Sequence, residues 1–348
     1  MLYMILFVSF RVRRKKAKVE NYVEEVVPRY TLDDFRRFFR MTRDTFEVIC
    51  QQLGTVLPEY QTARPSGRPA IPLQNQLMIF LWYIGSLEPL CRIGDRFNVT
   101  EFSVLRIRRR ICKMLLRHFK SKYIKWPDGQ DQQTVMNAFR EKKEFPLVIG
   151  ALDSTHIQIR PPKEHPQTYV NRKGYHSIVL QCVCREDMRF THCFAGWPGS
   201  CHDSRVLKNT DLFQNAQHLC QGGHLIGDGG FPLKEWLMTP FRDNGHLTNR
   251  QKHYNYCLSS TRQVIERSFG LLKGRFRRLQ NIDVCTVQVA VELCISGCIL
   301  HNICILQADE LDDYFNDNQG QMQNRHVVFL DNDAAGILKR DRISQHLP

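Results

Sequence analysis

The stretch HLIGDGGF, residues 224–231, places one acid, Asp228, between a short apolar run and two glycines. A tight turn explains the glycines, because glycine adopts turn conformations at no steric cost. A turn does not explain the acid, since the same order of apolar strand and then acid recurs in VIGALDSTH, residues 148–156, at Asp153. The repeated pattern predicts two strands that carry carboxylates to a common place.

A third acid, Glu266, stands among apolar residues in TRQVIERSFG. Helical periodicity predicts a helix from about 261 to 279, with Ser260 and Gln263 as a capping box at its start. The face of this helix that carries Glu266 also carries Arg262, Gly270 and Lys273. This face leaves room for a ligand beside the acid.

The order of predicted elements from residue 145 onward indicates the fold class. Three β-rich runs precede a helix, a fourth strand, a short helix, the helix with Glu266 and a long buried helix. These segments are 145–160, 175–186, 189–199, 201–213, 224–231, 234–241, 261–279 and 284–306. This order predicts an α/β, RNase H-like mixed-sheet domain over residues 140–308. In such a sheet the first and fourth strands lie side by side, so Asp153 and Asp228 would emerge together.

Three gathered carboxylates repel one another and lose hydration, at a cost of several kcal/mol unless a cation offsets their charge. Mg²⁺ or Mn²⁺ is the expected divalent cation, and two such ions about 4 Å apart support phosphodiester cleavage. We therefore expect Asp153, Asp228 and Glu266 to be catalytic, metal-binding acids. Asp203 is either a fourth metal ligand or a helix cap. The alternative is that Asp228 caps a turn and Glu266 forms a surface ion pair.

The positive charge of the chain, formally +14, is concentrated in its first third. Residues 1–125 hold 24 lysines and arginines against 11 acids, and residues 126–308 hold 21 against 16. Residues 309–348 hold 4 against 8. A basic surplus of this kind attracts a polyanion such as DNA. Solubility alone is the alternative explanation.

Residues 29–125 are predicted to form an all-α, helix-turn-helix DNA-binding domain. The segments 89–99 and 100–120 indicate two helices joined by a tight turn, with Thr100 as the N-cap of the second. In the second helix an apolar stripe lies opposite a basic stripe, as suits a helix lying along DNA phosphates. The basic stripe consists of Arg106, Arg109, Arg110, Lys113, Arg117 and Lys120. A solvated face of an ordinary amphipathic helix is the alternative.

The two ends of the chain differ in charge. Residues 1–28 are predicted to be a basic arm, whose RVRRKK run suits nuclear import or nucleic-acid contact. The apolar residues at the start precede the positive charge, which is the reverse of a secretory signal. We expect no membrane span, because no apolar run reaches about 18 residues. Residues 309–348 are predicted to be an acidic, weakly ordered tail.

The chain has 13 cysteines, spread through apolar segments without a CxxC pair. This distribution is typical of reduced cysteine used as a small hydrophobic residue inside the cell. A zinc site built from Cys294, Cys298 and His301 on one helix is geometrically feasible, but its spacing matches no standard ligand pattern.

The joint order of several motifs between about residues 150 and 303 resembles the PIF/Harbinger transposase superfamily, and most closely the Harbinger transposase-derived nucleases of animals. Each motif is weak alone, and their common order is specific. The motifs are GALDSTHIQIRPP, YVNRKGYHSI, GWPGSCHDSRVL, LIGDGGF, WLMTP, the Tyr-Asn pair at 254–255, VIERSFGLLKGRFRRL and ILHN.

The resemblance implies a DDE-type catalytic domain that uses a divalent metal, with Asp153, Asp228 and Glu266 as its acids. Asp203 stands at a further acidic position of the family pattern. Family members often act with a Myb/SANT-like DNA-binding partner that assists nuclear entry. The expected location is therefore the nucleus and also the cytoplasm, and a homo-oligomer is a further expectation.

Arg172 and Lys173, in the VNRKGYH loop, are candidates for DNA phosphate contact, and a solvated loop explains them equally well. The leading hypothesis is a metal-dependent DNA endonuclease of transposase origin. A non-catalytic DNA-binding or scaffold protein that retains the fold is the first alternative. An RNA-directed hydrolase of the same fold is the second.

Overall fold

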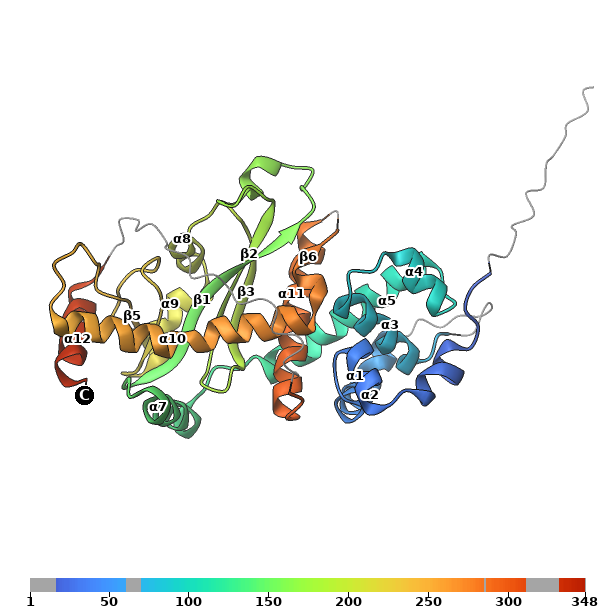
Figure 1. Ribbon diagram of the computed structural model, residues 1–348, viewed down its shortest axis with the longest axis horizontal. Helices are drawn as coiled ribbons and strands as arrows, with labels where there is room; N and C mark the ends of the chain where they lie inside the picture. Colours follow the sequence, from blue (N-terminus) through green and yellow to red (C-terminus); the bar gives the residue numbers. More distant parts are fainter. Residues whose placement is uncertain (1–16, 61–69, 285, 311–331, 348) are drawn as a thin grey trace, which may run out of the picture.

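The computed structural model describes residues 17–60, 70–284, 286–310 and 332–347. Figure 1 shows a helical part at one end of the molecule and an α/β part at the other. Helix α11 (Val287–Leu306) stands between the two parts, and the C-terminus lies at the end far from the helical part. The class predicted from the sequence, a mixed α/β protein with a mixed sheet and many helices, is confirmed.

Threonine caps begin three of the helices in the N-terminal part. Thr31, Thr42 and Thr100 each accept a hydrogen bond from a backbone N–H three residues later, which satisfies one of the free donors at a helix start. The predicted N-cap at Thr100 is thus confirmed. The helices of this part are α1 (Leu32–Phe39), α2 (Arg43–Val56), α3 (Leu73–Gly85), α4 (Leu90–Arg96), α5 (Glu101–Met114) and α6 (Lys120–Tyr123). Helix α7 (Gly129–Lys143) instead packs against β1 and α10 of the α/β part (Figure 1).

An aromatic cluster holds these helices together. Trp82, on the buried helix α3, stacks on Phe38 at 5.3 Å between ring centroids and meets Phe97 edge-on at 5.8 Å. Tyr22 also meets Trp82 edge-on and is buried. The prediction of a basic arm over 1–28 is therefore wrong from Tyr22 onward, because burial of this ring folds the chain against α3. Residues 1–16, with the RVRRKK run, lie outside the described residues.

The α/β part is built on one mixed sheet in the order β3-β2-β1-β4-β5. Strand β6 pairs with the C-terminal end of β1. Strands β1, β2 and β3 are antiparallel neighbours, whereas β4, β5 and β6 run parallel to their partners. The strands are β1 (Val148–Ile159), β2 (Ser177–Cys184), β3 (Phe190–Pro198), β4 (His224–Ile226), β5 (Leu237–Met238) and β6 (Asn281–Ile282).

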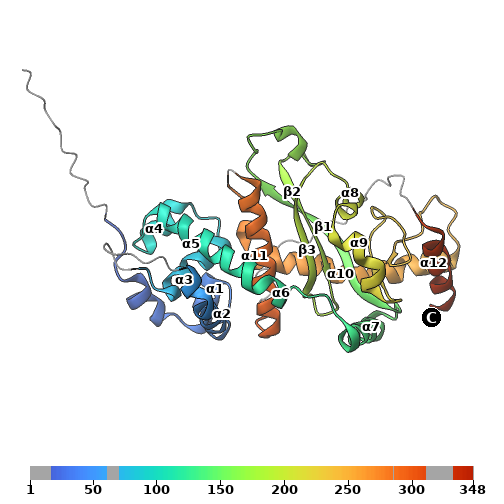
Figure 2. The ribbon, with the colours of Figure 1, turned by 180° about the vertical axis from the view of Figure 1, so that it is seen from behind.

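Helices cover both faces of the sheet (Figures 1 and 2). Helix α10 (Asn249–Arg275) packs along β1 and β2, and α11 packs against β3. On the other face, α8 (Asp203–Lys208) and α9 (Asp211–Cys220) share a core with Ile149 and Leu152 of β1. Successive residues of a strand point to opposite faces, so Ala151 and Asp153 face the side of α10.

Helix α11 is long and apolar enough to cross a membrane by length and composition, but 72% of its most apolar window is buried within the fold. Its side chains fill the space between β3 and the helical part. The fully buried Asn302 on α11 donates to the carbonyls of Tyr123 and Phe190 and accepts from the N–H of Phe190. The predicted long buried helix is confirmed.

Two local predictions are wrong. The helix that holds Glu266 begins at Asn249 rather than near 261, because Thr248 and Gln251 form the capping box that we had assigned to Ser260 and Gln263. The short helix predicted over 234–241 is instead the strand β5. Its backbone pairs with Leu225 and Ile226, and these ladder hydrogen bonds satisfy polar groups that a single helical turn would leave free.

The predicted weakly ordered tail, 309–348, is structured at both of its described ends. Asp309 is buried and forms an ion pair with Arg275, so it belongs to the core. Helix α12 (Ala334–His346) begins at the N-cap Asp333 and packs on α10. Lys339 of α12 donates to the carbonyls of Gly222 and Gly223. Residues 311–331 lie outside the described residues.

Candidate functional site

Asp153 lies in the middle of β1, where only 5% of it is exposed. Its Oδ1 accepts a hydrogen bond of 2.7 Å from the backbone N–H of Ser154. Strand β1 pairs in parallel with β4, with Ala151 opposite Ile226. Asp153 lies two residues after Ala151 on β1, and Asp228 lies two residues after the end of β4 at Ile226. The predicted adjacency of the first and fourth strands is therefore confirmed.

Asp228 and Asp203 approach each other at Gly230. The N–H of Gly230 donates to Oδ1 of Asp228 at 2.9 Å. A Cβ atom on Gly230 would lie 3.0 Å from Asp228 Oδ1 and 3.7 Å from Asp203 Oδ2. A side chain there would press on the Asp228 carboxylate, which would have to shift by a few tenths of an ångström, and would touch Asp203 at an ordinary van der Waals distance.

Glu266 reaches the site through Arg262, one turn earlier on α10. The guanidinium of Arg262 donates to Asp153 Oδ2 at 2.7 Å and to Glu266 Oε1 at 2.5 Å. Burial opposes the positive charge, but the charges of Asp153 and Glu266 outweigh it and raise the pKa of Arg262. Asp228 acts in the same direction. The guanidinium is therefore the common neighbour of three acids.

The four predicted acids lie in one region, but their carboxylate oxygens do not converge on one point. Within the described part of the chain, no three acids have ligand oxygens all within 4.8 Å of one another. Arg262 stands between Asp153 and Glu266 and offsets their mutual repulsion. The atoms that these acids offer to a metal are carboxylate oxygens, which suit a hard divalent cation. Arg262 would have to give up its contacts with Asp153 and Glu266 for an ion to bind between them. The donor type therefore fits such an ion, whereas the acids do not converge on a single point in this arrangement.

Lys273, further along α10 than Arg262, places a second basic side chain near Asp153. Its Nζ donates to Thr155 Oγ1 at 2.7 Å and to the carbonyl of His156 at 2.9 Å, which ties α10 to β1 just beyond Asp153. Burial lowers the pKa of Lys273 to about 8. The sequence had placed Lys273 on the face of Glu266, but it gave no sign of this contact with β1.

The loop with Arg172 and Lys173 is shaped by Asn171, which sequence reasoning missed. The amide of Asn171 donates to Ser177 Oγ, and its Oδ1 accepts from the backbone N–H of Lys173. Arg172 and Lys173 are both exposed, and a ring nitrogen of His202 lies 2.7 Å from Arg172 Nη2. His202 precedes Asp203, so this loop lies beside the acidic region. An uncharged asparagine in a polar loop carries no signal that would have singled it out.

The apolar and basic stripes of α5 lie as the sequence indicated. Val104, Ile107 and Ile111 are buried, and so is Leu115, the residue directly after α5. Arg110 differs from the rest of the predicted basic stripe, because it is only half-exposed and donates to Gln76 Oε1 on α3. The exposed members are Arg106, Arg109, Lys113, Arg117 and Lys120.

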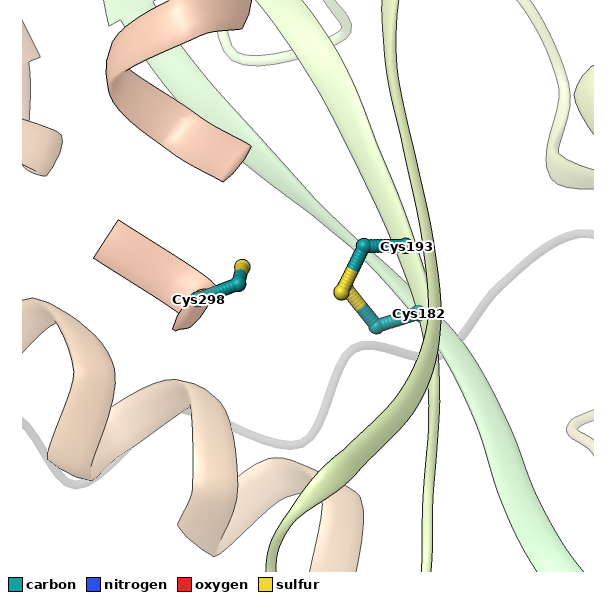
Figure 3. A group of neighbouring side chains, drawn as sticks. All are labelled: Cys182, Cys193 and Cys298. Atoms are coloured by element: carbon teal, nitrogen blue, oxygen red, sulfur yellow. The ribbon is translucent and has the colours of Figure 1, made fainter. Parts of the chain in front are cut away.

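The cysteines do not assemble the zinc site considered from the sequence. His301 lies with its Nε2 at 3.0 Å from the carbonyl of Met188, and not with Cys294 and Cys298. Cys298 instead faces two thiols on the sheet, those of Cys182 and Cys193 (Figure 3). The twelve cysteines that the structure describes are all free thiols.

Residues 152–302, which include all four acids, match the family model described as DDE superfamily endonuclease. The sheet, the acids and this match define the chain as a protein of the DDE endonuclease class. No solved structure matches it.

Curated relatives extend over nearly the whole chain. The human protein named Putative nuclease HARBI1 is 30% identical over 336 residues, which cover 92% of this chain and 92% of that protein. The Arabidopsis thaliana protein named ALP1-like is 29% identical over 341 residues, or 90% and 81% of the two chains. The chain therefore belongs to the family of Harbinger transposase-derived nucleases and ALP1-like proteins.

Proposed function

We propose that this protein is a metal-dependent DNA endonuclease of transposase origin, with an RNase H-like catalytic domain. The observation that carries the proposal is the parallel pairing of β1 with β4, since Asp153 follows the last paired residue of β1 by two positions and Asp228 follows that of β4 by two. The link of Arg262 to both Asp153 and Glu266 adds the third acid. The strand order, with three antiparallel strands followed by parallel additions beside the first, supports the RNase H-like assignment.

In the proposed mechanism Asp153, Asp228 and Glu266 would hold one or two divalent cations, Mg²⁺ or Mn²⁺, and Asp203 would be a further ligand. When bound, such ions activate a water and stabilise the departing oxygen of a phosphodiester. Asp153 is fixed by the backbone of β1, so its carboxylate is oriented before any ion arrives.

Basic side chains around the acids position the DNA in this proposal. Arg262 offsets the charges of Asp153 and Glu266, and its guanidinium is of the type that binds a phosphate by donated hydrogen bonds. Arg172 and Lys173 lie on the exposed loop beside Asp203. In this proposal they contact the phosphate backbone of the DNA strand that is cut.

Metal removal tests the catalytic proposal. We expect wild-type protein to nick supercoiled plasmid with Mg²⁺ or Mn²⁺ and to lose about 10³-fold or more of that rate in EDTA, because metal ions supply several kcal/mol of transition-state stabilisation. Gel quantification of nicked plasmid measures the rate. DNA binding in EDTA, followed by fluorescence anisotropy, is the control. Nicking that persists at full rate without a divalent ion would show that the metal mechanism is wrong.

We further propose that α4 and α5, joined through the turn at residues 97–100, form the helix-turn-helix that binds DNA. The exposed basic side chains of α5 meet phosphates, and Arg110 holds α5 against α3. Each lost phosphate contact reduces the slope of log K against log salt by about 0.9 for duplex DNA.

The double variant Arg109→Gln/Lys113→Gln is therefore expected to reduce that slope by about 2, with weaker binding to every DNA sequence. Anisotropy titrations from low to moderate salt measure it. The matched control is Arg250→Gln/Lys252→Gln, which removes two exposed charges from the start of α10. Equal slopes for wild type and the α5 variant would contradict DNA binding by α5.

A non-catalytic DNA-binding or scaffold protein is the second candidate function. It is favoured by the ion pairs of Arg262 with Asp153 and Glu266, which occupy two of the carboxylates that a metal would need. An Arabidopsis thaliana relative, 28% identical over 80% of this chain and 74% of its own length, is named Antagonist of like heterochromatin protein 1, a name that mentions no nuclease. Salt-dependent DNA binding without nicking under either ion would support this candidate.

The partners and location belong to the same proposal. We propose DNA and a Myb/SANT-like DNA-binding protein as partners, a homo-oligomeric state, no membrane association, and residence in the nucleus and also the cytoplasm. The basic surplus of residues 1–125 supports the nucleic-acid part. Light scattering of the purified chain tests the oligomeric state, and a monomer would contradict that part of the proposal. Microscopy with and without the Myb/SANT-like partner tests the location, and a protein confined to the cytoplasm under both conditions would contradict the nuclear part.

A further inference from the structure

Three buried thiols face one another between the sheet and α11. Cys182 of β2 and Cys193 of β3 are directly opposite each other in the antiparallel register, with their sulfurs 3.3 Å apart. Cys298 reaches towards them from α11, and the three Sγ atoms all lie within 4.8 Å of one another (Figure 3). Cys182 and Cys298 are fully buried, and Cys193 is 5% exposed.

The size of this group matches that of a thiolate metal site. An ion bound about 2.3 Å from each of three sulfurs separates those sulfurs by about 4 Å. Cys182, Cys193 and Cys298 already lie close to that spacing, so an ion would require only small movements. Sulfur ligands select zinc or copper(I) and not the Mg²⁺ or Mn²⁺ expected at the acids.

We propose that Cys182, Cys193 and Cys298 form a structural site for a soft d¹⁰ cation, zinc(II) or copper(I), that crosslinks β2, β3 and α11. This site is distinct from the acidic region, although Cys182 stands opposite Asp153 in the register of β1 and β2. It also does not depend on the proposed nuclease function. A bound ion would fix β2, which pairs with the strand that carries Asp153, and β3 beyond it.

The proton and charge balance of the site is simple. Burial raises the pKa of the Cys298 thiol, so this group is protonated without metal and loses its proton on binding. Counted from three neutral thiols, zinc(II) releases three protons and leaves a complex of charge −1, and copper(I) with two thiolates and one thiol releases two and also leaves −1. Lys120 acts electrostatically on Cys193 and partly offsets this charge.

Metal analysis of the full-length chain tests the proposal. We expect the protein, refolded with zinc or copper(I) and passed over a desalting column, to retain about one ion per chain by mass spectrometry. The variants Cys193→Ser and Cys298→Ser should bind at least about 100-fold more weakly in chelator competition, because loss of even an outer-shell partner costs 10–100-fold. Retention of zinc alone, copper alone or either ion supports the site and identifies the cation.

Cys304→Ser is the matched control, since Cys304 is equally buried on α11 but lies outside the group. Wild-type protein titrated with Cd²⁺ should also show thiolate-to-metal charge-transfer absorption, a measurement that needs no variant to fold. Absence of both retained metal and this absorption in the wild type would overturn the proposal. An equal loss of metal affinity in Cys304→Ser and Cys298→Ser would overturn it as well.

Discussion

Replacement of Asp153 by asparagine is expected to reduce plasmid nicking by about 10³-fold or more while leaving the fold intact. A carboxylate that holds a metal contributes several kcal/mol to transition-state stabilisation, and each 1.36 kcal/mol is a factor of ten in rate. The asparagine retains an oxygen that can accept from Ser154 or Arg262, so both contacts of the native side chain have a partial substitute. The measurement is the single-turnover rate with saturating Mg²⁺ or Mn²⁺.

The control for this variant is Asp243→Asn, an exposed acid in the loop after β5 whose bond to the N–H of Gly245 an amide oxygen can also accept. Circular dichroism and thermal melting establish that both variants are folded. Asp243→Asn should nick at the wild-type rate. If Asp153→Asn does so too, Asp153 has no catalytic role and the scaffold function becomes the better account of the site.

Replacement of Asp309 by alanine is expected to lower the free energy of unfolding by about 3–5 kcal/mol, because it leaves a buried charge without its partner. Asp309 Oδ1 pairs with Arg275 Nη1 at 3.2 Å, and Arg275 is 4% exposed. Asp309 Oδ2 accepts from the backbone N–H of Thr42 at 2.7 Å, at the start of α2. One carboxylate thus joins the helical part to α10 of the α/β part.

Urea denaturation followed by circular dichroism measures this effect. Glu310→Ala, which removes an exposed acid from the next position, is the matched control and should change stability by no more than about 0.5 kcal/mol. The conservative Asp309→Asn should fall between the two, because it can keep the bond to Thr42 and loses the charge. Equal stability of Asp309→Ala and Glu310→Ala would show that the ion pair adds nothing to the junction.

Local sequence signals predicted the elements that local physics controls. The cap at Thr100 and the apolar stripe of α5 follow from hydrogen bonding and helical period within a few residues. The start of α10 was missed, because Thr248 with Gln251 and Ser260 with Gln263 fit the same capping pattern. Burial of Tyr254 and Leu258 against the rest of the fold keeps the earlier turns helical.

The candidate site likewise combines residues that the sequence predicts with contacts that only the tertiary structure shows. The sequence named Asp153, Asp228 and Glu266 from strand–acid patterns and from the family motifs, and the structure places them around Arg262. The contact between Arg262 and Asp153 joins residues 109 positions apart. It depends on how α10 crosses β1, and no local pattern encodes that crossing.

By itself the sequence determined the acids and their order, the basic surplus of the first 125 residues and the α/β class, since composition and periodicity carry this information directly. Only the tertiary structure decided the parallel register of β1 and β4, the ion pairs of Arg262 and Asp309, and the meeting of three thiols from two strands and a helix. These features are contacts between segments distant in the chain. Their geometry comes from the packing of the whole core, to which many residues contribute and which no single stretch specifies.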